Sequence, residues 1–254
     1  MPPLKTEAIV IKTFDFRETS IIATLYTKDF GKINGILKGI KSSPVKFAST
    51  LEPFSHNEIV FYKKRNTALH LVSQCDLRDN FIYLRNNVTK FTLASLMMEL
   101  LDAIMPPEEV NYDIFDLSTT CLKAMSDYLY VDKIATIFKI KLLSLSGFKP
   151  HLDSCISCSS RILGQGKFSV GLGGLICPQC FRKDLKARSI YRGTIATILH
   201  IEKSDLAGNL RLGINPQIKR ELDSALASFI DFHIDKKLKS QNVLESLKLM
   251  EVKV

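Results

Sequence analysis

The sequence has no long apolar run, no secretory leader and few cysteines, and each absence excludes a class of protein. No stretch approaches the roughly 18 consecutive apolar residues of a membrane-spanning helix. The first residues lack the basic segment followed by an apolar one that marks a secretory signal. Six cysteines in 254 residues are too few for a disulfide scaffold. We therefore expect a soluble cytoplasmic protein in a reducing compartment, with no membrane partner.

The common signatures of catalysis are also missing. The chain contains no Walker A motif, no GxGxxG dinucleotide fingerprint and no HExxH metalloprotease motif. None of the five histidines stands beside an evident nucleophile or a pair of acidic residues. Because nothing supports ATP use or covalent catalysis, we expect a protein that is not an enzyme.

The composition that remains is globular, with an excess of positive charge. Hydrophobic residues make up 46% of the chain and charged residues 24%, enough for a sizeable core. Lys and Arg number 35 against 26 Asp and Glu, which gives a formal charge of +9. The excess is concentrated in residues 1–80 and 151–188. Nucleic acid is the obvious partner for such an excess, although solubility alone also accounts for it.

The first 80 residues predict a small β-barrel. Five short segments rich in β-branched and aromatic residues are separated by turn residues. They are residues 7–14, 20–27, 32–37, 58–62 and 67–73. Closing these strands into a barrel hides the edges of the sheet. Five strands suit an OB-fold but do not exclude an SH3-like barrel.

After residue 80 the apolar spacing becomes helical. We expect helices over residues 88–105, 133–146, 189–200 and 243–250. Two further helices are expected, one capped by Asp113 and a long one that begins at Asn215 and Pro216. The prediction is an α+β fold with an OB-fold domain over residues 1–80. An α-helical domain over residues 81–254 follows, with a cysteine-bearing module inserted at residues 151–188.

Four cysteines have the spacing of a zinc site. They follow the pattern C-x2-C-x18-C-x2-C and are Cys155, Cys158, Cys177 and Cys180. Two such turns direct four thiolates at one ion and leave no open position, which predicts one structural Zn²⁺. Four ordinary thiols or a redox pair are the alternatives, and His151 could replace one ligand. Cys75 and Cys121 are expected in the core.

Basic residues on the loops and strand ends of the barrel are the candidate DNA-binding set. They are Lys12, Arg17, Lys38, Lys41, Lys46, Lys63, Lys64 and Arg65. OB barrels bind single strands with cations on phosphates and aromatic rings under bases. Six aromatic residues are candidate stackers, most of them expected in the core: Phe14, Phe16, Tyr26, Phe30, Phe61 and Tyr62.

Several motifs resemble the RecO family of bacterial recombination mediators. Four lie in the barrel, at residues 17–20 (RETS), 27–32 (TKDFGK), 38–42 (KGIKS) and 51–54 (LEPF). Three more surround the cysteines, at residues 141–150 (KLLSLSGFKP), 151–158 (HLDSCISC) and 168–180 (FSVGLGGLICPQC). The resemblance covers nearly the whole chain, although past residue 188 only the helical character matches.

The resemblance implies a role in RecF-pathway recombinational repair. It implies binding to single- and double-stranded DNA, annealing of complementary strands, and work with RecR to let RecA replace the single-stranded DNA-binding protein (SSB) on gaps. Nucleoid association during repair and capture of the acidic, apolar SSB tail are implied as well. Candidate residues for the tail are Phe138, Lys139, Lys141 and Leu142.

Two other readings use the same features. A zinc-ribbon transcription or RNA-binding factor shares the charge and the cysteines, but it does not account for the helical domain around the insert. A zinc-dependent hydrolase needs an open coordination position and a general base, and four cysteines argue against it.

Overall fold

A computed structural model describes residues 2–42, 51–64, 67–162, 165–234 and 238–251. Its contacts divide the chain into two compact units, Met1–Ala135 with Leu238–Val254, and Thr136–Lys237. The domain boundaries expected from the sequence, at residues 80, 151 and 188, stay predictions. No helix in the described part of the chain has the length and apolar character needed to span a membrane.

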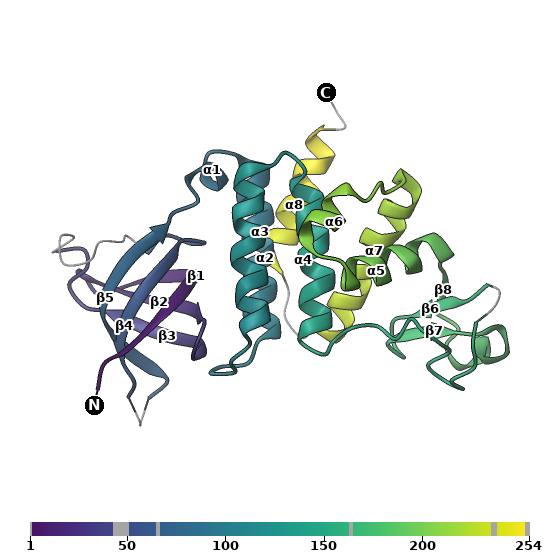
Figure 1. Cartoon of the computed structure of the whole chain (residues 1–254), viewed down its shortest axis with the longest axis horizontal. Helices are drawn as coiled ribbons and strands as arrows, with labels where there is room; N and C mark the ends of the chain where they lie inside the picture. The colour runs from purple at the N-terminus through teal and green to yellow at the C-terminus, as the bar shows by residue number, and fades with distance from the viewer. Residues whose placement is uncertain (1, 43–50, 65–66, 163–164, 235–237, 252–254) are drawn as a thin grey trace. The chain divides into compact units, whose positions relative to one another are not determined.

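The N-terminal residues form a closed five-stranded barrel (Figure 1). Its strands follow the order β1-β2-β3-β5-β4, with β3 and β5 parallel. They are β1 (Leu4–Phe16), β2 (Ser20–Thr27), β3 (Gly31–Leu37), β4 (His56–Tyr62) and β5 (Leu69–Asp79). The predicted OB-like barrel is confirmed, and each predicted strand is present. Four strands lie within three residues of their expected bounds, whereas β5 runs to Asp79, six residues past its expected end.

A long first strand closes the barrel. The first half of β1 pairs with β4, from Leu4 opposite Phe61 onward, and its second half pairs with β2 as far as Phe16 opposite Ser20. The register shifts between Val10 and Lys12, which is the irregularity expected where a strand bends between two neighbours. Alternate residues of the strands, such as Ala8 and Val10 of β1, point into the barrel and form its core.

Helices complete the first unit. They are α1 (Ile82–Arg85), α2 (Val88–Ile104), α3 (Tyr112–Asp127) and α8 (Lys239–Glu251). The cap predicted at Asp113 is wrong, because the Asn111 side chain accepts the Ile114 N–H and begins α3 two residues earlier. Asp113 instead lies in the first turn, where its charge favours the helix dipole.

The second unit holds the cysteine module and three helices. After α4 (Val131–Leu145) come β6 (Lys167–Ser169), β7 (Gly174–Ile176), the 3-10 helix η2 (Pro178–Lys183) and β8 (Arg188–Ser189). Helices α5 (Arg192–Lys203), α6 (Leu206–Arg211) and α7 (Pro216–His233) follow. The predicted cap of α7 is confirmed, since Asn215 accepts the Gln217 N–H. Helix α5 begins later than predicted because Arg188 and Ser189 pair with β6 instead.

Candidate nucleic-acid surface and metal centre

The four predicted cysteines lie together. Their sulfur atoms are all within 4.8 Å of one another, and the Cys158 and Cys177 sulfurs are 3.7 Å apart. Four sulfurs at about 2.3 Å from one tetrahedral ion lie roughly 3.8 Å from each other. The donor set and its spacing therefore fit a single metal ion held by four thiolates.

Backbone hydrogen bonds set the two cysteine turns against each other. The Ile156 N–H donates to Leu175 O at 2.8 Å, which fastens the first turn to β7. The second turn begins η2, where the Cys180 N–H donates to Cys177 O. Gly174 lets β7 approach closely, because a Cβ there would lie 2.5 Å from the His151 carbonyl oxygen.

The cysteines of the cluster have different pKa values. Burial disfavours the Cys155 thiolate, but backbone N–H donors outweigh it and lower the pKa of Cys155 to about 6. One of these donors, the Cys177 N–H, lies 3.4 Å from the Cys155 sulfur. Burial, together with the neighbouring Cys158 and Cys177, raises the pKa of Cys180 to about 11. Cys180 is therefore protonated near neutral pH, so a metal ion bound by all four sulfurs must displace its proton.

His151 is outside the group of ligands. Its Nε2 lies 2.7 Å from Ser154 Oγ, and its backbone bridges Gly173 and Leu175. The described cluster is thus a four-cysteine set, and four protein ligands leave no position for a reactive water. Cys75 and Cys121 are buried, as predicted for core residues.

Three of the predicted DNA-binding residues gather at one end of the barrel. The turn between β1 and β2 carries Arg17, and Lys38 and Lys41 follow β3 at the same end. The two segments are tied together, because the Lys41 N–H donates to Thr19 O at 3.1 Å. All three side chains are exposed, and Lys41 pairs with Asp15 at 2.7 Å. We call Arg17, Lys38 and Lys41 the basic rim.

The structure separates the remaining barrel cations from this rim. Lys63 and Lys64 follow β4 at the opposite end, where Phe61 pairs with Leu4. The Lys63 ammonium is 2.5 Å from the Glu108 carboxylate. Lys12 lies along β1 and is paired with Asp102 of α2 at 2.7 Å. Lys46 and Arg65 lie outside the described residues.

Of the six aromatic candidates, two are buried, three are half-buried and one is exposed, so fewer lie in the core than predicted. Tyr26 and Phe61 are fully buried in the barrel, and Phe30 packs edge-on against Phe61. Phe14 is 56% exposed, and the Lys12 ammonium lies 5.9 Å from the centre of its ring. The Arg17 guanidinium lies over Phe16 at 5.2 Å. Phe14 is the most accessible of the candidate rings, and Phe16 and Tyr62 are half-buried.

The residues proposed for the SSB tail all lie on α4. Phe138 and Leu142 are buried, and Lys139 and Lys141 are half-buried. The Lys141 ammonium donates to the backbone oxygen of Glu202 at 3.3 Å. The apolar side chains of this stretch are therefore packed inside the protein and are not exposed to a ligand.

A cavity in the second unit is lined by residues that the sequence analysis did not single out, among them Lys186, Arg188 and Phe232. The sequence marked this region only by the charge excess of residues 151–188. The cavity depends on β8 and α7 packing side by side, which no local pattern predicts.

Comparisons with known proteins agree with the motifs. The family model described as "Recombination protein O N terminal" matches residues 1–81, and "Recombination protein O C terminal" matches residues 85–242. Together they span both compact units of the chain.

Three relatives that match this chain over most of their length carry the same name. The chain is 30% identical to "DNA repair protein RecO" of Alkaliphilus metalliredigens, over 92% of this chain and 94% of the relative. It is 30% identical to the protein of the same name from Syntrophus aciditrophicus, over 97% and 96%. For the protein of that name from Thermoanaerobacter sp., the identity is 29% over 97% and 99%.

Proposed function

Because the chain belongs to the RecO family of DNA repair proteins, we propose that it is a DNA-binding recombination mediator that anneals complementary single strands. With RecR, it helps RecA replace SSB on single-stranded gaps. It does so by binding rather than by covalent chemistry. Its place of work is then the bacterial cytoplasm, at the nucleoid during repair.

The observation that carries this proposal is the basic rim on the closed barrel. Arg17, Lys38 and Lys41 stand on two hydrogen-bonded segments at one barrel end. Exposed cations of this kind neutralise phosphates without reading bases. Annealing needs phosphates that are neutralised and bases that are left uncontacted, because two strands must approach each other while their bases stay free to pair. It needs no nucleotide hydrolysis.

Two partners besides DNA belong to the proposal. RecR acts with this protein in loading RecA. The SSB tail binds on α4, with Lys139 and Lys141 facing its acidic residues and Phe138 and Leu142 its apolar end. Because Phe138 and Leu142 are buried, capture of the tail there requires local opening around α4. Charge reversal at Lys139 should then lower the affinity of the protein for SSB and leave its affinity for bare DNA unchanged.

We also propose that the four-cysteine cluster holds one Zn²⁺. Cys155, Cys158, Cys177 and Cys180 supply four sulfurs, the donor set that zinc takes in closed structural sites. The ion would stabilise the module at residues 151–188 and take no part in the reaction with DNA. The closed donor set also weighs against a zinc-dependent hydrolase.

The proposal is tested by loading RecA on SSB-coated gapped DNA. RecA ATPase activity is followed with this protein alone, with RecR alone and with both. We expect the lag in RecA activity to shorten only when both are present. An unchanged lag with both proteins, under conditions where each binds its partner, would contradict the mediator role. A preference for RNA in competition with DNA of the same sequence would favour the RNA-binding alternative.

A further inference from the structure

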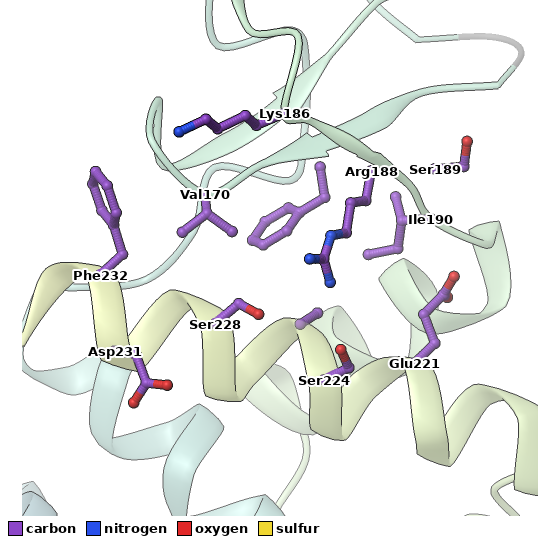
Figure 2. A pocket seen from close by; sticks show the side chains of 12 residues that line it. Val170, Lys186, Arg188, Ser189, Ile190, Glu221, Ser224, Ser228, Asp231 and Phe232 are labelled. Atoms are coloured by element: carbon purple, nitrogen blue, oxygen red, sulfur yellow. The ribbon is translucent and has the colours of Figure 1, made fainter. Parts of the chain in front are cut away.

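A cavity of about 470 Å³ lies in the second unit between the cysteine module and α7. Figure 2 shows its two walls: side chains of β8 and its neighbours on one side, and the face of α7 that carries Ser224 and Ser228 on the other. The volume is within the roughly 300–1,000 Å³ of small-ligand sites. Contacts fix these walls, since the His233 Nε2–H donates to Val170 O at 2.9 Å.

The cations and the carboxylates that line this cavity lie on opposite walls, with Lys186 and Arg188 on the strand side and Glu221 and Asp231 on α7. Arg188 directs its guanidinium toward α7, and the Lys186 side chain extends toward the end that carries Phe232 (Figure 2). Neither cation forms an ion pair with another residue in the described ranges. Glu221 is already engaged, because it accepts the Tyr191 N–H and the Thr194 hydroxyl. The Asp231 carboxylate points away from the strand wall. The strand wall is therefore the cationic side of the cavity and the side suited to an anion.

The rest of the lining is suited to a flat ring with polar edges. Phe232 is 62% exposed at the end of α7, a large apolar surface left in water. Phe168, Val170 and Ile190 make the apolar wall. Ser224 and Ser228 add hydroxyls that both donate and accept. A nucleobase presents a π-face and a row of donors and acceptors, and its phosphate supplies the anion.

A second cavity extends the first. It measures about 360 Å³ and shares three lining residues with its neighbour: Val170, Lys186 and Phe232. Lys183 adds a cation to its lining and Asp184 a carboxylate, which accepts hydrogen bonds from the Ser169 hydroxyl and the Lys186 N–H. Two adjoining cavities with a lysine and an aromatic ring at their boundary match a chain of repeating units better than a single small molecule. A nucleic-acid strand repeats base and phosphate in this way.

We propose that these two cavities bind a short stretch of single-stranded DNA with its bases unstacked. One base lies against Phe232, and the flanking phosphates lie on Arg188 and Lys186. The inference rests on the proposed DNA-binding function and adds a second contact, on the cysteine module, to the basic rim of the barrel. An acidic peptide also offers anions, but it presents a flat ring only where it carries an aromatic side chain, whereas every nucleotide carries one.

The test measures the affinity of the full-length, zinc-loaded protein for fluorescein-labelled dT20 by anisotropy at several salt concentrations. Arg188→Glu should weaken binding about tenfold at low salt and reduce the salt slope by about 1. Phe232→Ala should weaken it about fivefold or more without changing the slope, because stacking releases no counterion. Arg161→Glu is the matched control, since Arg161 is exposed on the same module and does not line either cavity. It should change affinity less than twofold.

Each outcome decides between named alternatives. Equal losses in Arg188→Glu and Arg161→Glu would mean that only the net charge of the module matters, which overturns the inference. Wild-type affinity in both cavity variants overturns it as well. The double variant Lys38→Glu with Lys41→Glu separately tests whether the barrel binds dT20. Failure of the wild-type protein to bind dT20 would contradict the proposed function itself. If the cavity variants no longer bind a peptide of four Asp and a terminal Phe but bind dT20 with wild-type affinity, the site is a peptide site. Melting temperature and zinc content show that each variant is folded.

Discussion

The Lys12 ammonium of the barrel lies 2.7 Å from the Asp102 carboxylate of α2, and Lys32 approaches the other oxygen of that carboxylate at 3.3 Å. Asp102 is 10% exposed and Lys32 14%, whereas Lys12 is 41% exposed. One nearly buried carboxylate thus holds two lysines from β1 and β3, the strands on either side of β2. The arrangement anchors the barrel on its helix and neutralises part of the charge of Lys12.

Asp102→Asn should destabilise the protein strongly, because it leaves the half-buried Lys32 ammonium without its counter-charge. We expect a loss of about 3 kcal/mol in the free energy of unfolding, measured by urea denaturation. Lys12→Ala removes the more exposed partner and should cost less than about 1 kcal/mol. Equal losses in the two variants would show that Asp102 is not the centre of the arrangement.

Lys12 should contribute less to DNA binding than Lys38 does. Asp102 already neutralises Lys12, whereas Lys38 is exposed on the basic rim and forms no ion pair within the described residues. Lys38→Ala should therefore lower the affinity for single-stranded DNA and reduce the salt slope by about 1. Lys12→Ala should leave the slope nearly unchanged. Anisotropy titrations at several salt concentrations compare the two, and the reverse order would contradict the assignment.

Glu108→Gln should change both acid stability and DNA binding. The Lys63 ammonium, which donates to this carboxylate, holds the pKa of Glu108 below its ordinary value of 4.5. A lowered carboxyl pKa adds stability above the ordinary pKa, and this stability is lost as the pH falls through the lowered value. The wild-type advantage in melting temperature over the Gln variant should therefore shrink below about pH 4.5.

The same substitution frees Lys63 for phosphate. If Lys63 contacts DNA, Glu108→Gln should raise the affinity about twofold and steepen the salt dependence. A melting-temperature difference that does not vary with pH would show that the ion pair contributes nothing. Unchanged DNA affinity would remove Lys63 from the interface.

Cys155→Ser or Cys177→Ser should abolish stoichiometric zinc binding and lower the melting temperature of the module. Each substitution removes one of four thiolates from a closed site, and structural zinc contributes directly to folding. Cys121→Ala is the control, because Cys121 is buried outside the cluster. It should lower stability and keep one zinc per chain by atomic absorption. Full zinc content in Cys155→Ser would contradict the four-cysteine site.

Local sequence patterns predicted much of this fold. The strands followed from runs of β-branched and aromatic residues, the α7 cap from Asn215 and Pro216, and the cysteine cluster from its spacing. Each of these depends on residues close together in the chain. The cap at Asn111 was missed because Asp113 is an equally good capping residue and only the observed hydrogen bond separates them.

The features that the sequence did not reveal depend on distant contacts. Lys12 and Asp102 are 90 residues apart, so no spacing rule could indicate that this lysine is neutralised. The separation of Lys63 from the basic rim follows from strand register, which five short segments do not specify. The cavity at Arg188 requires β8 to pair with β6, where the apolar pattern had suggested a helix.

The most direct test of the central claim is annealing of complementary fluorescent oligonucleotides coated with cognate SSB, without nucleotide. The account predicts fast annealing by the wild-type protein, and annealing slowed at least about tenfold by Lys38→Glu with Lys41→Glu at low salt. The variant should keep its zinc and its melting temperature. No annealing by the wild-type protein, either alone or with RecR, would contradict the account, as would full annealing by the double variant.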